Sequence, residues 1–329
     1  MQRETMMAIT GVGGFIGLRM AERALARGMK VRGLERSHAA GERARRVGVD
    51  VTLGDVRDPA AVRRLCIGSS VVFHTAAIVG ENGPSELFHD VNVHGTEVLL
   101  AAAKECGVRR FVHMSSAMVY GFTFPPEVTE DAPLKGEGNA YCESKVASER
   151  LVFEAHGKGG MQVVVLRPGD VYGPGSVPWV IRPIGLMKKR MFALIDEGKG
   201  VFNHLHVDNL VDGVFLALDT DRTGEAFTLT DGMRTTFAEY FTLLARMLGR
   251  STPRSIPSPA ARQVLGAMET GARLFGKTPP VRAAVVDFLL RPHTYSMDKA
   301  RAKLGYSPRI SLAAGMREVE AWARSTRLL

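Results

Sequence analysis

The chain has 329 residues, enough to bury a large core, and its composition of 45% hydrophobic and 23% charged residues is that of an ordinary globular protein. Its net charge of +9 comes from scattered basic residues without any nucleic-acid-binding motif, so we expect no nucleic-acid partner. The three cysteines, Cys66, Cys106 and Cys142, match no metal-site spacing, and their odd number argues against a disulfide framework. We therefore expect no metal and a reducing compartment.

The sequence also lacks the signals of export or membrane insertion. Residues 1–6 are polar where a signal peptide would carry an apolar segment, and no apolar run approaches the roughly 18 residues of a membrane span. These features predict a cytoplasmic protein.

Strand-like and helix-like segments alternate through the first half of the chain. Short, apolar, mostly β-branched runs predict strands over 7–10, 30–34, 49–53, 71–77, 110–115 and 162–166. Helical patterns lie between them over 15–27, 59–66, 92–105 and 141–156. This alternation predicts an α/β fold with a Rossmann-type, doubly wound parallel sheet.

The pattern changes after residue 172. A loop-like stretch is followed by a helix over 209–218, a strand over 226–230, and helices over 236–248, 260–274, 281–290 and 312–323. We expect a dinucleotide-binding domain over 1–172, to which elements from about 204–232 return. Residues 173–203 and 233–329 are then predicted to form a smaller, mostly helical substrate lobe over the carboxyl ends of the strands.

A glycine-rich loop follows the first predicted strand and opens the first predicted helix, with Gly11, Gly14 and Gly17 at intervals of three. Glycines permit a tight turn and a close approach of backbone N–H groups to a pyrophosphate, and a helix N-terminus favours negative charge. The loop therefore predicts a dinucleotide site. Its spacing departs from G-x-G-x-x-G, because Ile16 stands where the third glycine would fall when counted from Gly11 and Gly13.

Glu35 ends the second predicted strand. A carboxylate there can accept hydrogen bonds from the adenosine ribose and repel a 2′-phosphate, which favours NAD. Arg36 comes next and could instead hold a 2′-phosphate, so NADP stays an alternative.

Tyr141 and Lys145 lie four residues apart at the start of a predicted helix and so share one face. A neighbouring ammonium lowers the pKa of a phenol from about 10, so the phenol can exchange a proton with an alcohol or a carbonyl. Ser115 and Ser116 end the fifth predicted strand, where a hydroxyl can position the reacting oxygen. Together with the glycine loop, these residues indicate a dehydrogenase-like active site.

With these motifs the chain resembles the extended short-chain dehydrogenase/reductase family, within the NAD-dependent epimerase/dehydratase superfamily, over nearly its whole length. The resemblance implies that Tyr141 is the general acid/base, that Lys145 lowers its pKa and binds the nicotinamide ribose, and that Ser116 fixes the substrate oxygen. It implies further cofactor contacts along the chain, at Phe15, Ile16, Asp55, Val56, Thr75, Ala76, Ala77, Asn92, Ser115, Pro168 and Val171. Asn92 could alternatively cap its helix, and Ser115 could be satisfied by backbone.

The substrate is less well defined by the sequence. The chain lacks an arginine before 204–206 that nucleotide-sugar enzymes often carry, and Met118 and Val119 replace the acidic pair that a dehydratase needs. The segments 203–210 and 293–308 resemble the 3β-hydroxysteroid dehydrogenase and sterol-carboxylate dehydrogenase branch, and the apolar helices over 260–290 suit a hydrophobic substrate or simply pack the lobe's own core. We expect Ser116, Met118, Tyr141, Gly169 and His204 to face the substrate, although a structural histidine is equally compatible with position 204.

The expected activity is therefore interconversion of a secondary alcohol and a ketone on a steroid or a long-chain β-hydroxy/β-keto substrate. The alternatives are a nucleotide-sugar 4-epimerase and, less favoured, a non-catalytic dinucleotide sensor. The resemblance also implies a homodimer through the helices at 92–105 and 141–156. The apolar helices and Arg262, Arg273, Lys277 and Arg282 leave contact with a membrane surface as a weaker expectation.

Overall fold

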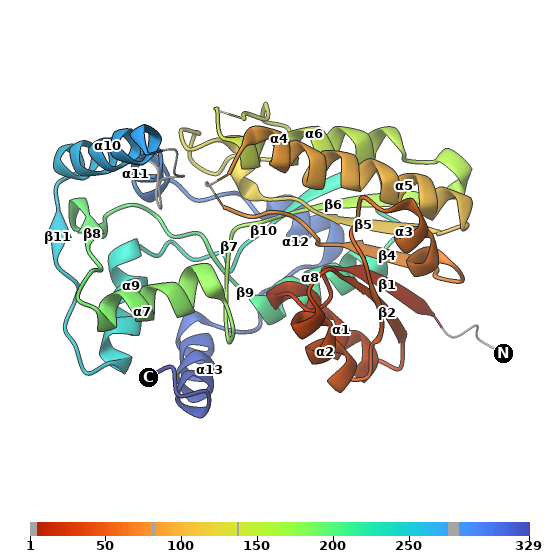
Figure 1. The fold of residues 1–329 in the computed structure, drawn as a ribbon, viewed down its shortest axis with the longest axis horizontal. Coiled ribbons are helices and arrows are strands. Elements are labelled where there is room, and N and C mark those ends of the chain that lie inside the picture. The colour runs from red at the N-terminus through yellow and green to blue at the C-terminus, as the bar shows by residue number, and fades with distance from the viewer. Residues whose placement is uncertain (1–4, 81–82, 137, 276–282) are drawn as a thin grey trace.

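The computed structural model describes residues 5–80, 83–136, 138–275 and 283–329 (Figure 1). Its core is a seven-stranded sheet in the order β10-β6-β5-β4-β1-β2-β3, and every neighbouring pair is parallel. The order reverses between β1 and β4, which is where sheets of this kind bind ligands. This topology confirms the predicted doubly wound sheet. Its strands are β1 (Met6–Thr10), β2 (Lys30–Glu35), β3 (Asp50–Leu53), β4 (Val71–His74), β5 (Arg110–Met114), β6 (Gln162–Pro168) and β10 (Glu225–Leu229).

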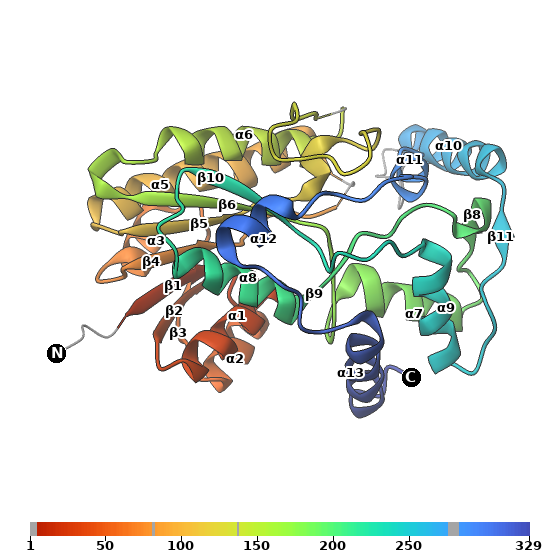
Figure 2. The same ribbon diagram turned by 180° about the vertical axis from the view of Figure 1, so that it is seen from behind.

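Helices cover both faces of the sheet (Figures 1 and 2). One face carries α1 (Phe15–Ala26), α2 (His38–Arg46), α8 (Val207–Leu218) and α12 (Asp298–Leu304), which share one apolar core with the strands. The other carries α3 (Pro59–Cys66), α5 (Gly95–Glu105) and α6 (Ala140–Glu154), which share a second core. Double coverage explains why strands such as β6 are buried along nearly their whole length.

A second lobe lies beyond the carboxyl ends of the strands (Figure 1). Its core is aromatic: the ring centroids of Phe202 and Tyr240 are 4.1 Å apart, and Phe237 and Phe241 pack beside them. The lobe contains the π-helical turn η4 (Val177–Ile181) and the helices α7 (Arg182–Lys188), α9 (Phe237–Met247), α10 (Ser258–Leu274), α11 (Val285–Leu289) and α13 (Leu312–Ser325). Two short strand pairs accompany them, β8 (Leu194–Ile195) with β11 (Ser255–Ile256) and β7 (Asp170–Tyr172) with β9 (His204–His206).

Some elements differ from the sequence-based expectation. Helix α2 was not predicted, because its buried positions are the small residues Ala40, Gly41 and Ala44 rather than large apolar ones. The helix expected over 92–105 begins earlier, as α4 (Ser85–Phe88) and the π-helical segment η1 (His89–His94) continue directly into α5. The helix expected over 281–290 is seen as α11, and residues 281–282 lie outside the described residues. Within the described ranges, no helix combines the length and apolarity needed to cross a bilayer.

Candidate active site

The glycine loop closes tightly between β1 and α1. Gly11 has a φ of +65°, which favours glycine, and a Cβ on Gly17 would lie 2.3 Å from the Gly11 carbonyl oxygen. Gly13 is equally constrained, since a Cβ there would lie 2.3 Å from the Ala40 carbonyl oxygen of α2. Gly14 caps α1 without any side-chain hydrogen bond to its first turn. The helix N-terminus thus presents backbone N–H groups as a cradle that fits a pyrophosphate.

Glu35 ties the loop to the end of β2. Its carboxylate accepts hydrogen bonds from the backbone N–H groups of Gly13 (3.0 Å), Arg36 (3.0 Å) and Ser37 (3.1 Å). These bonds fix the carboxylate at the edge of the cradle, where it can receive a ribose. On the neighbouring strand end, hydrogen bonds from Arg57 hold the pKa of Asp55 down at about 2, so this second carboxylate is ionised near neutrality.

A cavity of about 700 Å³ extends from this cradle to the second lobe. Its lining brings together residues that are far apart in the sequence, at the carboxyl ends of β1, β2, β4, β5 and β6 and at the start of α6. It includes all the expected cofactor and substrate residues except Asn92 and His204: Gly11, Gly14, Phe15, Ile16, Gly17, Glu35, Arg36, Asp55, Val56, Thr75, Ala76, Ala77, Ser115, Ser116, Met118, Tyr141, Lys145, Pro168, Gly169 and Val171.

The serine, tyrosine and lysine meet in this cavity because each stands at the end of an element. Ser116 follows β5 and caps the 3₁₀ turn η2 (Ala117–Tyr120), accepting a hydrogen bond from Met118 N–H at 3.2 Å. Tyr141 is in the first turn of α6 and lines the cavity together with Ser116. Lys145 Nζ lies 5.9 Å from the Tyr141 ring centroid and donates to the Met114 carbonyl oxygen at 2.7 Å.

Burial dominates the titration of this group. It raises the pKa of Tyr141 above its usual value, and the Ser116 hydroxyl only partly offsets that increase. Burial also lowers the pKa of Lys145 to about 8. The lowering of the tyrosine pKa by Lys145 together with the positive charge of the oxidised nicotinamide stays a prediction.

A buried ion pair that was not predicted from the sequence lies behind the group of Ser116, Tyr141 and Lys145. Glu149 of α6 accepts hydrogen bonds from Arg167 of β6 at 2.7 and 3.0 Å, and both side chains are almost fully buried. Ser115 Oγ donates to the same carboxylate. Ser115 is thus satisfied by a side chain rather than by backbone, and α6 is fixed against the strand ends.

Two expected contacts are corrected by the structure. Asn92 does not line the cavity: its amide pairs with both backbone groups of Ile78 (2.7 and 3.0 Å) and donates to Ser144 Oγ (2.9 Å). It therefore joins the loop after β4 to α6 and supports the site indirectly. His204 also lies outside the lining. Both of its ring nitrogens are hydrogen-bonded, to Asp231 and Thr235, at 2.9 Å each.

The wall of the cavity on the side of the second lobe is apolar. It is formed by Pro178 and Trp179 of η4 and by Val285, Phe288 and Leu289 of α11. The apolar lid expected from residues 260–290 is thus provided by α11, whereas Val264 and Met268 of α10 are exposed, at 59% and 43%. Of the basic residues behind the membrane-surface expectation, Arg262 pairs with Asp287 (2.7 Å), and Lys277 and Arg282 lie outside the described residues.

His206, Asp208 and Glu318 come close enough together to suggest a metal site. His206 Nδ1, however, accepts a hydrogen bond from Asp208 N–H, which leaves the proton of the neutral ring on Nε2, the nitrogen that faces Glu318 at 3.6 Å. Asp208 is already bound by Arg19 at 2.7 and 2.9 Å. These contacts favour a structural role for the group.

Residues 7–229 match the model of the NAD dependent epimerase/dehydratase family, and the chain belongs to this family. Its members use NAD, and the glycine cradle, the Glu35 carboxylate and the Ser–Tyr–Lys group could hold and serve this cofactor. The most similar curated relatives include named reductases and dehydrogenases, so the protein is an enzyme of this family.

Three relatives are similar over nearly their full length. The 4-hydroxy-2-methyl-3-oxo-4-farnesyl-3,4-dihydroquinoline-1-oxide ketoreductase of Stigmatella aurantiaca is 32% identical over 94% of this chain and 93% of its own. The 2-alkyl-3-oxoalkanoate reductase of Stenotrophomonas maltophilia is 29% identical, over 95% and 98%. The 3β-hydroxysteroid dehydrogenase/Δ5→4-isomerase of Mycobacterium tuberculosis is 29% identical, over 91% and 85%. These similarities confirm the predicted branch of the family.

Among solved structures, a dTDP-glucose 4,6-dehydratase from Streptomyces venezuelae with NAD bound superposes with a TM-score of 0.80. It is 25% identical and is covered over 98% of both chains. The whole fold, including the second lobe, is therefore that of the extended enzymes of this family.

Proposed function

We propose that the protein interconverts a secondary alcohol and a ketone on a hydrophobic substrate, with NAD as the redox partner. The observation that carries the proposal is the cavity itself, which joins the glycine cradle and the Ser116, Tyr141 and Lys145 group to the apolar wall of Trp179 and Phe288. A hydrophobic molecule that fills the apolar side would present its oxygen to the polar group.

Each of the three polar residues has a defined task in this proposal. The Tyr141 hydroxyl takes the proton from the alcohol, or returns it to the ketone oxygen. Ser116, which lines the cavity together with Tyr141, holds the same oxygen in place. The Lys145 ammonium stabilises the phenolate form of Tyr141. NAD, when bound, accepts or supplies the hydride and in its oxidised form adds a positive charge.

The names of the relatives support reduction of a ketone, since two of them are reductases of 3-oxo compounds and one is a hydroxysteroid dehydrogenase. The likeness to the structure of a sugar-nucleotide dehydratase supports a second candidate function, that of a nucleotide-sugar 4-epimerase. An epimerase reoxidises its cofactor within each turnover. Net formation of reduced cofactor during turnover therefore separates the two candidates.

The test uses the purified protein with NAD and a panel of 3-hydroxysteroids, long-chain β-hydroxy acids and nucleotide sugars. We expect reduced nicotinamide to accumulate with a hydrophobic alcohol, and Tyr141→Phe to lower kcat by about 10²- to 10⁴-fold. Tyr172→Phe is the matched control, because Tyr172 is equally buried but lies outside the cavity lining. Epimerised sugar without net reduced cofactor, or an unchanged kcat in Tyr141→Phe, would contradict the proposal.

A further inference from the structure

Three charged residues of the cavity lining, Asp55, Asp170 and Arg291, form ion pairs. Asp170 pairs with the buried Arg291, and Lys145 is bound to a backbone carbonyl. Asp55 pairs with Arg57 near the adenosine end, where the carboxylate of Glu35 and the side chain of Arg36 also line the cavity.

Arg182 is the cavity-lining arginine on the side of the second lobe, whereas Arg36 lies at the opposite end, next to the glycine cradle. Arg182 lines the cavity at the start of α7, it is exposed, and its guanidinium forms no hydrogen bond or ion pair with any residue that the structure describes. It is thus a free cation on the side of the cavity that faces the second lobe.

The surroundings of Arg182 are apolar. Trp179 lies three residues earlier, in the π-helical turn η4 that continues into α7, and both side chains line the cavity. The Trp179 ring stacks on Phe288 of α11, with centroids 6.0 Å apart and planes at 21°. A free guanidinium next to an apolar wall is suited to a ligand with an apolar body and an oxyanion, because a guanidinium binds carboxylate and phosphate through two parallel hydrogen bonds.

We infer that Arg182 binds an anionic group of the substrate, so that the enzyme acts on hydrophobic acids in preference to neutral steroids. This inference rests on the proposed function and narrows its substrate class. The oxyanion could be the carboxylate of a free acid or a phosphate of an acyl thioester. The shared chemistry is an oxyanion carried by an apolar chain.

Binding can be measured without turnover, because the cavity contains its own fluorophore. The chain has two tryptophans, Trp179 in the cavity wall and Trp322 in α13. In a Trp322→Phe background with NAD present, Trp179 emission reports the binding of dodecanoate, dodecanoyl-coenzyme A and the neutral analogue methyl dodecanoate. We expect the dodecanoate anion to bind about tenfold more tightly than its methyl ester.

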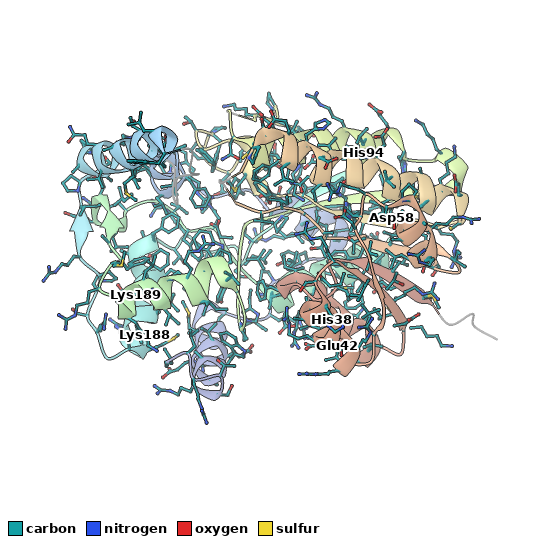
Figure 3. The ribbon with its side chains drawn as sticks, viewed as in Figure 1. His38, Glu42, Asp58, His94, Lys188 and Lys189 are labelled. Atoms are coloured by element: carbon teal, nitrogen blue, oxygen red, sulfur yellow. The ribbon has the colours of Figure 1, made fainter. Side chains whose placement is uncertain are left out.

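Arg182→Gln should remove this preference while leaving the affinity for the ester unchanged. Its stability should be unaltered, because no described residue loses a partner. Lys189→Gln is the matched control: it removes a cation at the end of the same helix (Figure 3), outside the cavity lining. Retention of the preference by Lys189→Gln would show that nearby charge alone does not produce it. If the thioester rather than the acid loses affinity in Arg182→Gln, the source of the oxyanion is the phosphate.

Three outcomes would overturn the inference: neither dodecanoate nor dodecanoyl-coenzyme A binding the parent protein more tightly than the ester, unchanged affinities for both anions in Arg182→Gln, or weaker binding of NAD in Arg182→Gln with no change in the affinity for either anion. The last result would assign the guanidinium to the cofactor.

Failure of the proposed function gives a different result. A protein that binds dodecanoate through Arg182 but forms no reduced cofactor with any alcohol would have the anion site without the proposed activity.

Discussion

At the scale of single residues, the buried cation of Lys145 lowers the stability of the folded enzyme considerably. Lys145 is almost fully buried, and its ammonium donates a hydrogen bond to the Met114 carbonyl oxygen. The decrease of its pKa from the usual 10.5 to about 8 corresponds to about 3 kcal/mol of destabilisation at neutral pH. Such a cost is typical of a group that is kept for function rather than for stability.

This cost predicts a pH dependence of stability. Between pH 8 and pH 10.5 the unfolded chain binds the lysine proton and the folded protein does not, so the free energy of unfolding contributed by this group increases with pH across that window. Lys145→Met removes the group. We expect the variant to be more stable than the parent at pH 7, and the difference to shrink by about 2–3 kcal/mol on going to pH 10.

The measurement is urea unfolding of both proteins, freed of nucleotide, at several pH values. Comparing the two curves cancels the contributions of the buried tyrosines, which titrate in both. If the difference in the free energy of unfolding between the two proteins stays constant from pH 7 to pH 10, Lys145 is not held with a depressed pKa.

At the scale of elements, the site depends on how helices begin. Asn139 caps α6, and its side-chain oxygen accepts hydrogen bonds from the backbone N–H groups of Tyr141 (3.0 Å) and Cys142 (3.1 Å). The cap therefore fixes the turn that carries the catalytic phenol.

Asn139→Ala should lower the free energy of unfolding by about 1 kcal/mol, and kcat should fall as well because the first turn of α6 is less well fixed. Asn139→Asp keeps the acceptor oxygen and should retain both stability and kcat. Urea unfolding and steady-state kinetics of the two variants test the pair. A loss of stability in Asn139→Ala without a change in kcat would limit the cap to a structural role.

Strand ends and helix starts also explain how much of the site the sequence could predict. Ser116 and Tyr141 carry readable signals, since one ends an apolar strand and the other opens a helix after a good cap residue. Helix α2 carried no such signal, although it packs directly on Gly13 and makes that glycine obligatory. His204 looked like a substrate contact because the sequence does not show that Asp231 and Thr235 engage its ring.

At the scale of the whole molecule, ion pairs join segments that are far apart in the sequence. Arg19 of α1 binds Asp208 of α8 through two hydrogen bonds, and Asp170 after β6 binds Arg291 beyond α11. Pairs separated by more than a hundred residues follow no local pattern, so periodicity and motifs cannot reveal them. The free guanidinium of Arg182 is therefore apparent only in the folded structure, where Asp170 and Arg291 of the same cavity are paired with each other.

The outer surface of α5 and α6 is the remaining feature of the whole molecule, and the family resemblance assigns a two-fold interface to it. A shallow groove between the two helices is lined by Leu100, Ala101 and Leu151, and its rim mixes both charge signs at Glu97, Lys104, Glu154 and Lys158. A surface with apolar residues at the centre and both charge signs at the rim can pair with its own copy about a two-fold axis.

We therefore expect a homodimer in solution, measured by light scattering after size-exclusion chromatography. Ala101→Arg would place a bulky cation at the centre of this surface in both protomers, and the pair of like charges should shift the protein to monomers. Ala260→Arg introduces the same side chain on the exposed surface of α10 and should leave the dimer intact. A monomeric parent protein would show that this surface forms no dimer. A dimer that persists in Ala101→Arg would place the association surface elsewhere, because an interface centred on this groove cannot bury two arginines without partners.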